Sequence, residues 1–393
     1  MRTDLRKKAA LVFSHFTIFL YGAAALYLYV RQSQWVDGAV YESDLPAHIS
    51  MAQEDGGIYS LTSLLYRLLA PLPYGTFCIA LFLALCTVGA VYAAAALIRE
   101  LSGERNYPEG FYELAGLIVN LVMPCYIKGF ADGRYIGMQS PSVWHNSTYI
   151  AMKFPALLSL LIFIRMEKQI REKIKASDWL IFTFLLLLTT AVKPSFLVVF
   201  APMMLVYLLR DLIKGVPFGR LFIFGCGVLP SLAVILIQNA LLFGADTGNG
   251  FAVLPGQAMM QHTGYPLVVT VLSLLFPLTV LAFHIRKLTE NAWYRGAWIM
   301  AGIGFLEYFL LAETGTRISD GNFLWGYSIA ICALFIASLV VWLEDCLKWK
   351  EKENSLPGKV GALLAVAALI WHLYCGIYFF VNLVQGTSYW MWA

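Results

Sequence analysis

A chain of 393 residues that is 60% hydrophobic and only 13% charged is not a water-soluble globular protein, because soluble domains carry roughly a quarter charged residues. The mean hydropathy of +0.69 leads to the same exclusion, so the lipid bilayer must be the solvent for much of the chain. The net charge of +4 is modest, and we expect no nucleic-acid partner. The seven cysteines show no spacing typical of disulfides or zinc sites.

The first apolar segment, residues 9–30, follows a basic N-terminus. It is about as long as a full span and no small-residue cleavage site follows it, so we predict a retained transmembrane helix rather than a signal peptide. Ten more apolar segments predict an all-α integral membrane protein with about 11 transmembrane helices, in one domain of residues 1–393. They lie near residues 75–98, 112–127, 148–165, 178–192, 195–209, 221–243, 265–284, 294–312, 323–343 and 361–384.

Two readings are open for residues 178–209. They form either one kinked helix or two short spans that turn at Lys193-Pro194. A single helix of this length would be long for one crossing at 1.5 Å per residue. The tight hairpin is therefore favoured.

The distribution of basic residues predicts the orientation. If the N-terminus is cytoplasmic and the spans alternate, 21 of the 28 Lys and Arg residues lie inside and seven lie outside. Cytoplasmic loops of membrane proteins are rich in Lys and Arg. The charge count also supports the hairpin at Lys193-Pro194, because merging the two spans into one would place the basic residues 210–220 outside. The C-terminus is then also outside.

The first outer loop, residues 31–74, contains the segment Tyr-Glu-Ser-Asp-Leu-Pro-Ala-His at positions 41–48. Pro46 suits the first turn of a helix, with Ser43 or Asp44 as a cap, and Gly56-Gly57 would end that helix. Residues 58–69 then have an apolar stripe at helical spacing. We expect two helices that lie along the membrane surface, with Asp44 at the entrance of the first.

Several polar residues of the other outer loops are candidates for a site, because loops on a rigid scaffold often carry chemistry. Cations at membrane depth are costly unless they pair or line a wet cavity, yet Lys153 and Lys193 could equally extend to the interface. Arg134 and Arg317 could equally pair with Asp132 and Asp320. Asn146-Ser147-Thr148 fits a glycosylation sequon, but its position against a span argues against glycosylation. The candidate cations are Lys128, Arg134, Lys153, Lys193 and Arg317, and the other cleft candidates are Glu42, His48, His145, His262 and Glu313.

A metal site is not indicated by the sequence. No pair of His or acidic residues has a convincing ligand spacing on a helix. Glu42 and Asp44 could share a divalent ion, but acidic residues two positions apart are common by chance. We expect no cofactor, although a divalent metal is possible.

The first loop resembles the acidic motif of the GT-C superfamily of membrane glycosyltransferases in the segment Glu42-Ser-Asp44-Leu-Pro-Ala-His48. The predicted topology is similar over most of the chain, although the large soluble C-terminal domain of the oligosaccharyltransferase branch is missing. The resemblance implies a smaller GT-C member in a bacterial plasma membrane. Its donor would be a sugar on polyprenyl phosphate, and its acceptor a glycan, lipid or protein. Asp44 would be the general base and the outer cations would bind the donor phosphate.

Three other functions remain open. A transporter or flippase of lipid-linked glycans would also be polytopic, although no inverted repeat is detectable. A polysaccharide polymerase or ligase of another membrane fold would depend on outer residues such as His145 and Arg317. A purely structural membrane subunit is the third.

Overall fold

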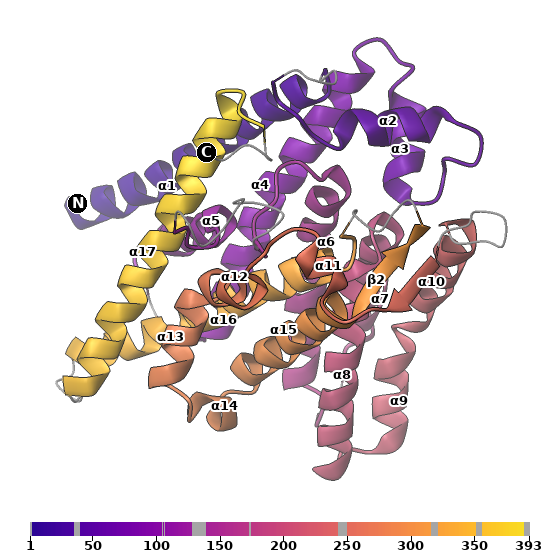
Figure 1. Ribbon diagram of the computed structural model, residues 1–393. Helices are drawn as coiled ribbons and strands as arrows, with labels where there is room; N and C mark the ends of the chain where they lie inside the picture. The colour runs from indigo at the N-terminus through magenta and orange to yellow at the C-terminus, as the bar shows by residue number, and fades with distance from the viewer. Residues whose placement is uncertain are drawn as a thin grey trace.

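The computed structural model describes residues 2–34, 40–103, 105, 107–127, 139–172, 174–242, 250–315, 321–350 and 356–388. These residues form a helical bundle with one small sheet (Figure 1). The first ten helices are α1 (Arg2–Gln32), α2 (Leu45–Gln53), α3 (Leu61–Leu69), α4 (Gly75–Ser102), α5 (Phe111–Leu121), α6 (Ser147–Lys168), α7 (Ala176–Val192), α8 (Ser195–Ile213), α9 (Phe218–Cys226) and α10 (Leu229–Leu242).

The second half of the chain is helical as well, apart from two short strands. Strands β1 (Gly250–Val253) and β2 (Leu311–Thr314) pair antiparallel, with Gly250 opposite Thr314 and Val253 opposite Leu311. The remaining helices are α11 (Gln257–Met260), α12 (Pro266–Ser273), α13 (Leu275–Phe283), α14 (Lys287–Glu290), α15 (Ala292–Leu310), α16 (Leu324–Lys350) and α17 (Leu356–Val384).

Seven helical stretches of the described residues are long and apolar enough to cross a membrane. They are α1, α4, α6, α8, α9 with α10, α16 and α17. The apolar part of α16 is entirely buried, and it packs against α15, α8, α13 and α4. The chain is therefore an all-α, multi-pass membrane protein built around α16. The predicted total of about 11 spans stays a prediction.

The hairpin at Lys193-Pro194 is confirmed. Helix α7 ends at Val192 and α8 begins at Ser195. Lys193 contacts Thr148 in the first turn of α6, whereas Arg210 in the last turn of α8 contacts Glu167 near the end of α6. Helices α7 and α8 therefore run in opposite directions alongside α6.

Two predicted spans differ from the continuous helices expected. Helix α5 ends at Leu121, before Pro124, because proline disfavours helix in the preceding residue; its 11 residues reach only about 17 Å. The segment 265–284 is broken at Leu274 into α12 and α13, which are bent by 69°. Pro277 explains the break, since its ring excludes the carbonyl of residue 273 from a continuous helix.

The loops at the two ends of the bundle confirm which segments lie together. At one end, which we name the basic end, ion pairs join Arg165 and Lys168 to Glu100, and Arg105 and Lys287 to Glu344. All of these segments were predicted to share one side of the membrane. At the other end, which we name the loop end, the loop between α1 and α4 contacts the C-terminal segment through a hydrogen bond from the Tyr41 amide to the Gly386 carbonyl, 3.3 Å.

The two helices predicted in the first loop are present as α2 and α3. Helix α3 begins with a capping box, in which Ser60 and Ser63 each bond the backbone of the other. The turn between the helices has Gly56 at φ +79°, a conformation that favours glycine. Figure 1 shows both helices at the side of the bundle where α4 begins.

Candidate functional site

Asp44 lies at the start of α2, and its carboxylate is not the cap that the sequence suggested. The residue occupies the N-cap position without a side-chain capping bond. The hydroxyl of Ser43 accepts the Leu45 amide instead, at 3.1 Å, and donates to the carbonyl of His145 at 2.9 Å. The Asp44 carboxylate is thus directed to a long-range partner, and 29% of its side chain is exposed.

The long-range partner is the segment that leads into α6. The amide of Asn146 donates to Oδ2 of Asp44 at 2.8 Å, while its Oδ1 accepts the backbone amide of Tyr149 at 2.9 Å and so caps α6. Nε2 of His145 is 3.8 Å from the same carboxylate oxygen. Asn146 therefore fixes the position of the Asp44 carboxylate, and the His145 ring lies beside it.

His145 is neutral in this arrangement. Its side chain is 2% exposed, and burial lowers the pKa of its imidazole to about 3, with a further contribution from the charge of Lys193. The contact between His145 and Asp44 is therefore between a neutral ring and a carboxyl group. It adds no positive charge beside Asp44.

The positive charge of the cluster comes from Lys193. Its ammonium donates to the hydroxyl of Thr148 at 3.0 Å and lies 5.6 Å from the ring centre of Trp325, near the start of α16. The Trp325 ring is also 5.6 Å from the His145 ring and is buried. The loop containing Asp44, the start of α6, the α7–α8 turn and the start of α16 therefore meet at one point, the Asp44 cluster.

His48 provides a second link between the first loop and α6. Its Nδ1 and the hydroxyl of Ser147 are hydrogen-bonded at 2.8 Å. Because His48 is four residues after Asp44 on the same helix, both face α6. Helix α2 is thus attached to the first turn of α6 at two points.

The other predicted site residues are distributed differently. Lys153 is buried and donates to the carbonyl of Pro141 at 3.0 Å, so its ammonium is enclosed rather than open to a lipid phosphate. Glu42 accepts a hydrogen bond from Ser388. Lys128, Arg134 and Arg317 lie outside the described residues, as do Asp132 and Asp320.

His262 and Glu313 belong to a second polar group near the small sheet. Nδ1 of His262 is 2.9 Å from the Ala258 carbonyl, and Glu313 accepts a hydrogen bond from the amide of Asn322 at 2.7 Å. Within the parts of the chain that the structure describes, no three His, Cys, Asp or Glu side chains are placed to hold a metal ion.

Three residues of the Asp44 cluster were not among the predicted site residues. Asn146 and Thr148 were considered only as part of a glycosylation sequon, and Trp325 only as part of an apolar segment. The capping role of Asn146 was predictable, because an Asn immediately before a helix is a typical N-cap. Its hydrogen bond to Asp44 was not predictable, because the two residues are 102 positions apart.

Comparisons with known proteins do not assign the chain to a family. No family model matches the chain, and no curated protein matches its sequence.

Proposed function

We propose that the protein is an inverting glycosyltransferase that moves a sugar from polyprenyl phosphate to an acceptor hydroxyl, with Asp44 as the general base. The observation that carries the proposal is the Asp44 cluster: a partly exposed carboxylate, fixed by Asn146, with the Lys193 ammonium in the same group of side chains. A fixed carboxylate with access to solvent suits proton abstraction.

The proposed reaction uses the acid and the cation in different roles. The acceptor oxygen attacks the anomeric carbon from the face opposite the phosphate, and its proton passes to Asp44. The bond between the anomeric carbon and the phosphate oxygen breaks, and its electron pair leaves with the polyprenyl phosphate. Lys193 stabilises the negative charge that develops on this phosphate. Lys128, Arg134 and Arg317 are further candidates for the same task.

The fold and location proposed with this function are those of a GT-C-like enzyme in a bacterial plasma membrane. The N-terminus would be cytoplasmic and the Asp44 cluster would face outwards. The excess of Lys and Arg at the basic end supports this orientation. Helices α2 and α3 would lie in the outer interface, where leucines on one face of α3, such as Leu64 and Leu68, are exposed.

The test is sugar transfer by the purified full-length protein. Radiolabelled hexose and pentose on undecaprenyl phosphate serve as donors, and membrane glycans, lipids and proteins as acceptors. Asp44→Asn should abolish transfer while the protein stays folded. Asp55→Asn is the matched control, because Asp55 is an exposed carboxylate of the same loop, and it should retain the full rate.

Two outcomes would favour other functions. Full transfer by Asp44→Asn, with His145 or Arg317 essential, would favour a polymerase or ligase of another membrane fold. Movement of lipid-linked glycan across proteoliposomes that contain no acceptor would favour a flippase.

A further inference from the structure

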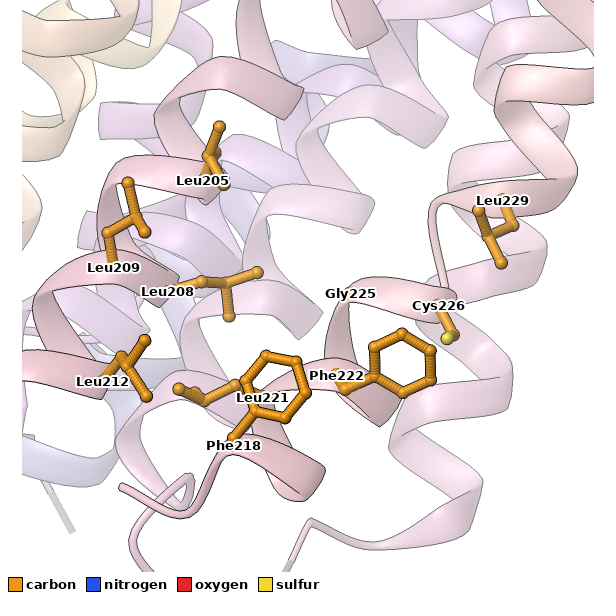
Figure 2. Close-up of a pocket in the computed structure, with 10 residues that line it drawn as sticks. All are labelled: Leu205, Leu208, Leu209, Leu212, Phe218, Leu221, Phe222, Gly225, Cys226 and Leu229. Carbon is orange, nitrogen blue, oxygen red and sulfur yellow. The ribbon is translucent and has the colours of Figure 1, made fainter. Parts of the chain in front are cut away.

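An apolar groove lies between α8 and α9, toward the basic end of the bundle and away from the Asp44 cluster (Figure 2). Its volume is about 280 Å³, which is near the lower limit of about 300 Å³ for small-molecule pockets. Every side chain that lines it is apolar, including Leu205, Leu209 and Leu212 of α8, Phe218 and Phe222 of α9, and Leu229 of α10.

The shape of the groove suits a hydrocarbon chain. Leu205 and Leu212 are seven residues apart on one helix, so the groove follows α8 for about 10 Å. Figure 2 shows Leu205, Leu209 and Leu212 in succession along α8, facing Phe218 and Phe222 across the groove. No lining side chain is polar, so a polar ligand would lose its hydrogen bonds to water there.

Basic residues lie in the chain segments at the end of the groove near the α8–α9 turn. Lys214 is exposed in this turn, two residues after Leu212 of the groove. Arg220 donates to the carbonyl of Ile170 at 2.8 Å, which brings the α6–α7 turn beside the α8–α9 turn. The α6–α7 turn adds Arg171 and Lys175, both exposed.

The acidic residues near this end neutralise the rim in part. Glu167 and Asp211 both pair with Arg210, and the charge of Lys214 also acts on Glu167. Glu172 and Asp178 are the other described carboxylates of the two turns and their flanks, and Arg171, Lys175, Lys214 and Arg220 are the other cations. Five cations including Arg210 thus stand against four carboxylates, and one net positive charge remains beside the apolar groove.

We propose that this groove binds one acyl chain of an anionic phospholipid, with the phosphate at Lys214 and Arg220. An apolar groove that ends at a positive rim matches a hydrocarbon chain attached to a negative headgroup. A Lys or Arg near the membrane surface favours an anionic lipid by about fivefold. The lipid would join α8 to α9 and stabilise this side of the bundle.

The test compares two lipids on the full-length protein. Purified protein in detergent is incubated with phosphatidylglycerol or with phosphatidylcholine of the same acyl chains, and bound lipid is counted by native mass spectrometry. The wild type should retain at least about fivefold more phosphatidylglycerol. The exposed position of Lys214 makes Lys214→Glu safe for folding, and this variant should lose most of that preference.

The groove itself is tested by filling it. A Cβ on Gly225 would lie 3.6 Å from Leu208, an ordinary contact, so Gly225→Leu should fold and occupy the groove. It should bind less of both lipids. Gly219→Leu is the matched control on α9, because nothing lies within 4 Å of a Cβ there, and it should bind lipid like the wild type. Gel filtration verifies that each variant is folded.

Three results would overturn the proposal. The first is equal retention of the two lipids by the wild type, and the second is unchanged retention by folded Gly225→Leu. The third concerns undecaprenyl phosphate, which also joins an apolar chain to a phosphate. If it displaces phosphatidylglycerol from the wild type at equal concentration, and Gly225→Leu abolishes its binding, the groove is a site for the polyprenyl lipid instead.

Discussion

Asn146 combines two roles that substitution can separate. Its Oδ1 caps α6 by accepting the Tyr149 amide, and its Nδ2 donates to the Asp44 carboxylate. Asn146→Ser keeps a capping oxygen but removes the amide donor, whereas Asn146→Ala removes both. Loss of an N-cap costs about 1 kcal/mol of stability. A hydrogen bond to a charged group contributes about 1.5–3 kcal/mol, of which solvent recovers part here because Asp44 is partly exposed.

We expect Asn146→Ser to keep the helix cap, to lose the part of the hydrogen-bond energy that solvent does not recover, and to transfer sugar at least about tenfold more slowly, since about 1.4 kcal/mol corresponds to a factor of ten. Asn146→Ala should be equally slow and less stable than Asn146→Ser by about 1 kcal/mol. Initial rates with labelled undecaprenyl-phosphate sugars and thermal unfolding in detergent measure the two effects. Asn382→Ser is the control, because that amide bonds within its own helix, α17. A wild-type rate for Asn146→Ser, or equal stability of the two variants, would refute the reasoning.

Three more predictions concern other parts of the molecule. Burial lowers the pKa of His145 to about 3, so below about pH 6.5 the unfolded chain binds a proton that the folded chain does not. Lowering the pH from 7 to 5 should therefore cost about 2 kcal/mol at this residue, and His145→Gln should unfold with a correspondingly weaker pH dependence in thermal scans. Lys193→Met should slow transfer about 100-fold by removing the cation that we propose stabilises the leaving phosphate, while Lys193→Arg should retain more activity in the same assay. Gly376→Ala should destabilise the bundle, because its Cβ would lie 1.6 Å from the Leu121 carbonyl oxygen, whereas Gly302→Ala, with open space around it, should raise thermal stability by up to about 1 kcal/mol.

The features that were predictable from the sequence depend on local chemistry. Pro46 and Gly56-Gly57 correctly delimited α2 in the first loop, and Lys193-Pro194 correctly marked the hairpin. The charge count also grouped the loops that ion pairs join at the basic end. The Pro and Gly residues affect only the few residues around them, and the charge count adds up whole loops. Neither kind of prediction requires knowledge of the tertiary packing.

The breaks within apolar segments and the partners of Asp44 were not predicted. Hydropathy averages over a window, so it does not register that Pro124 and Pro277 interrupt hydrogen bonding in the middle of an apolar segment. Averaging over a window also explains why the predicted span 294–312 includes the first two residues of the strand Leu311–Thr314. The contact between Asp44 and Asn146 joins residues 102 positions apart, and one sequence contains no signal for such a pair.

The start of α2 shows why Asp44 is better suited to chemistry than to capping. An aspartate at an N-cap normally accepts a backbone amide of its own helix, which would keep its oxygen occupied. Here Asp44 makes no capping bond, Ser43 accepts the amide of the first helical residue, Leu45, and Asp44 accepts a side-chain amide from the start of α6. The position of the carboxylate thus depends on how the first loop packs on α6. It follows that the cluster forms only when the bundle is assembled. Substitutions at the contact between α2 and α6 should therefore disturb the geometry of the Asp44 cluster more than the rest of the fold.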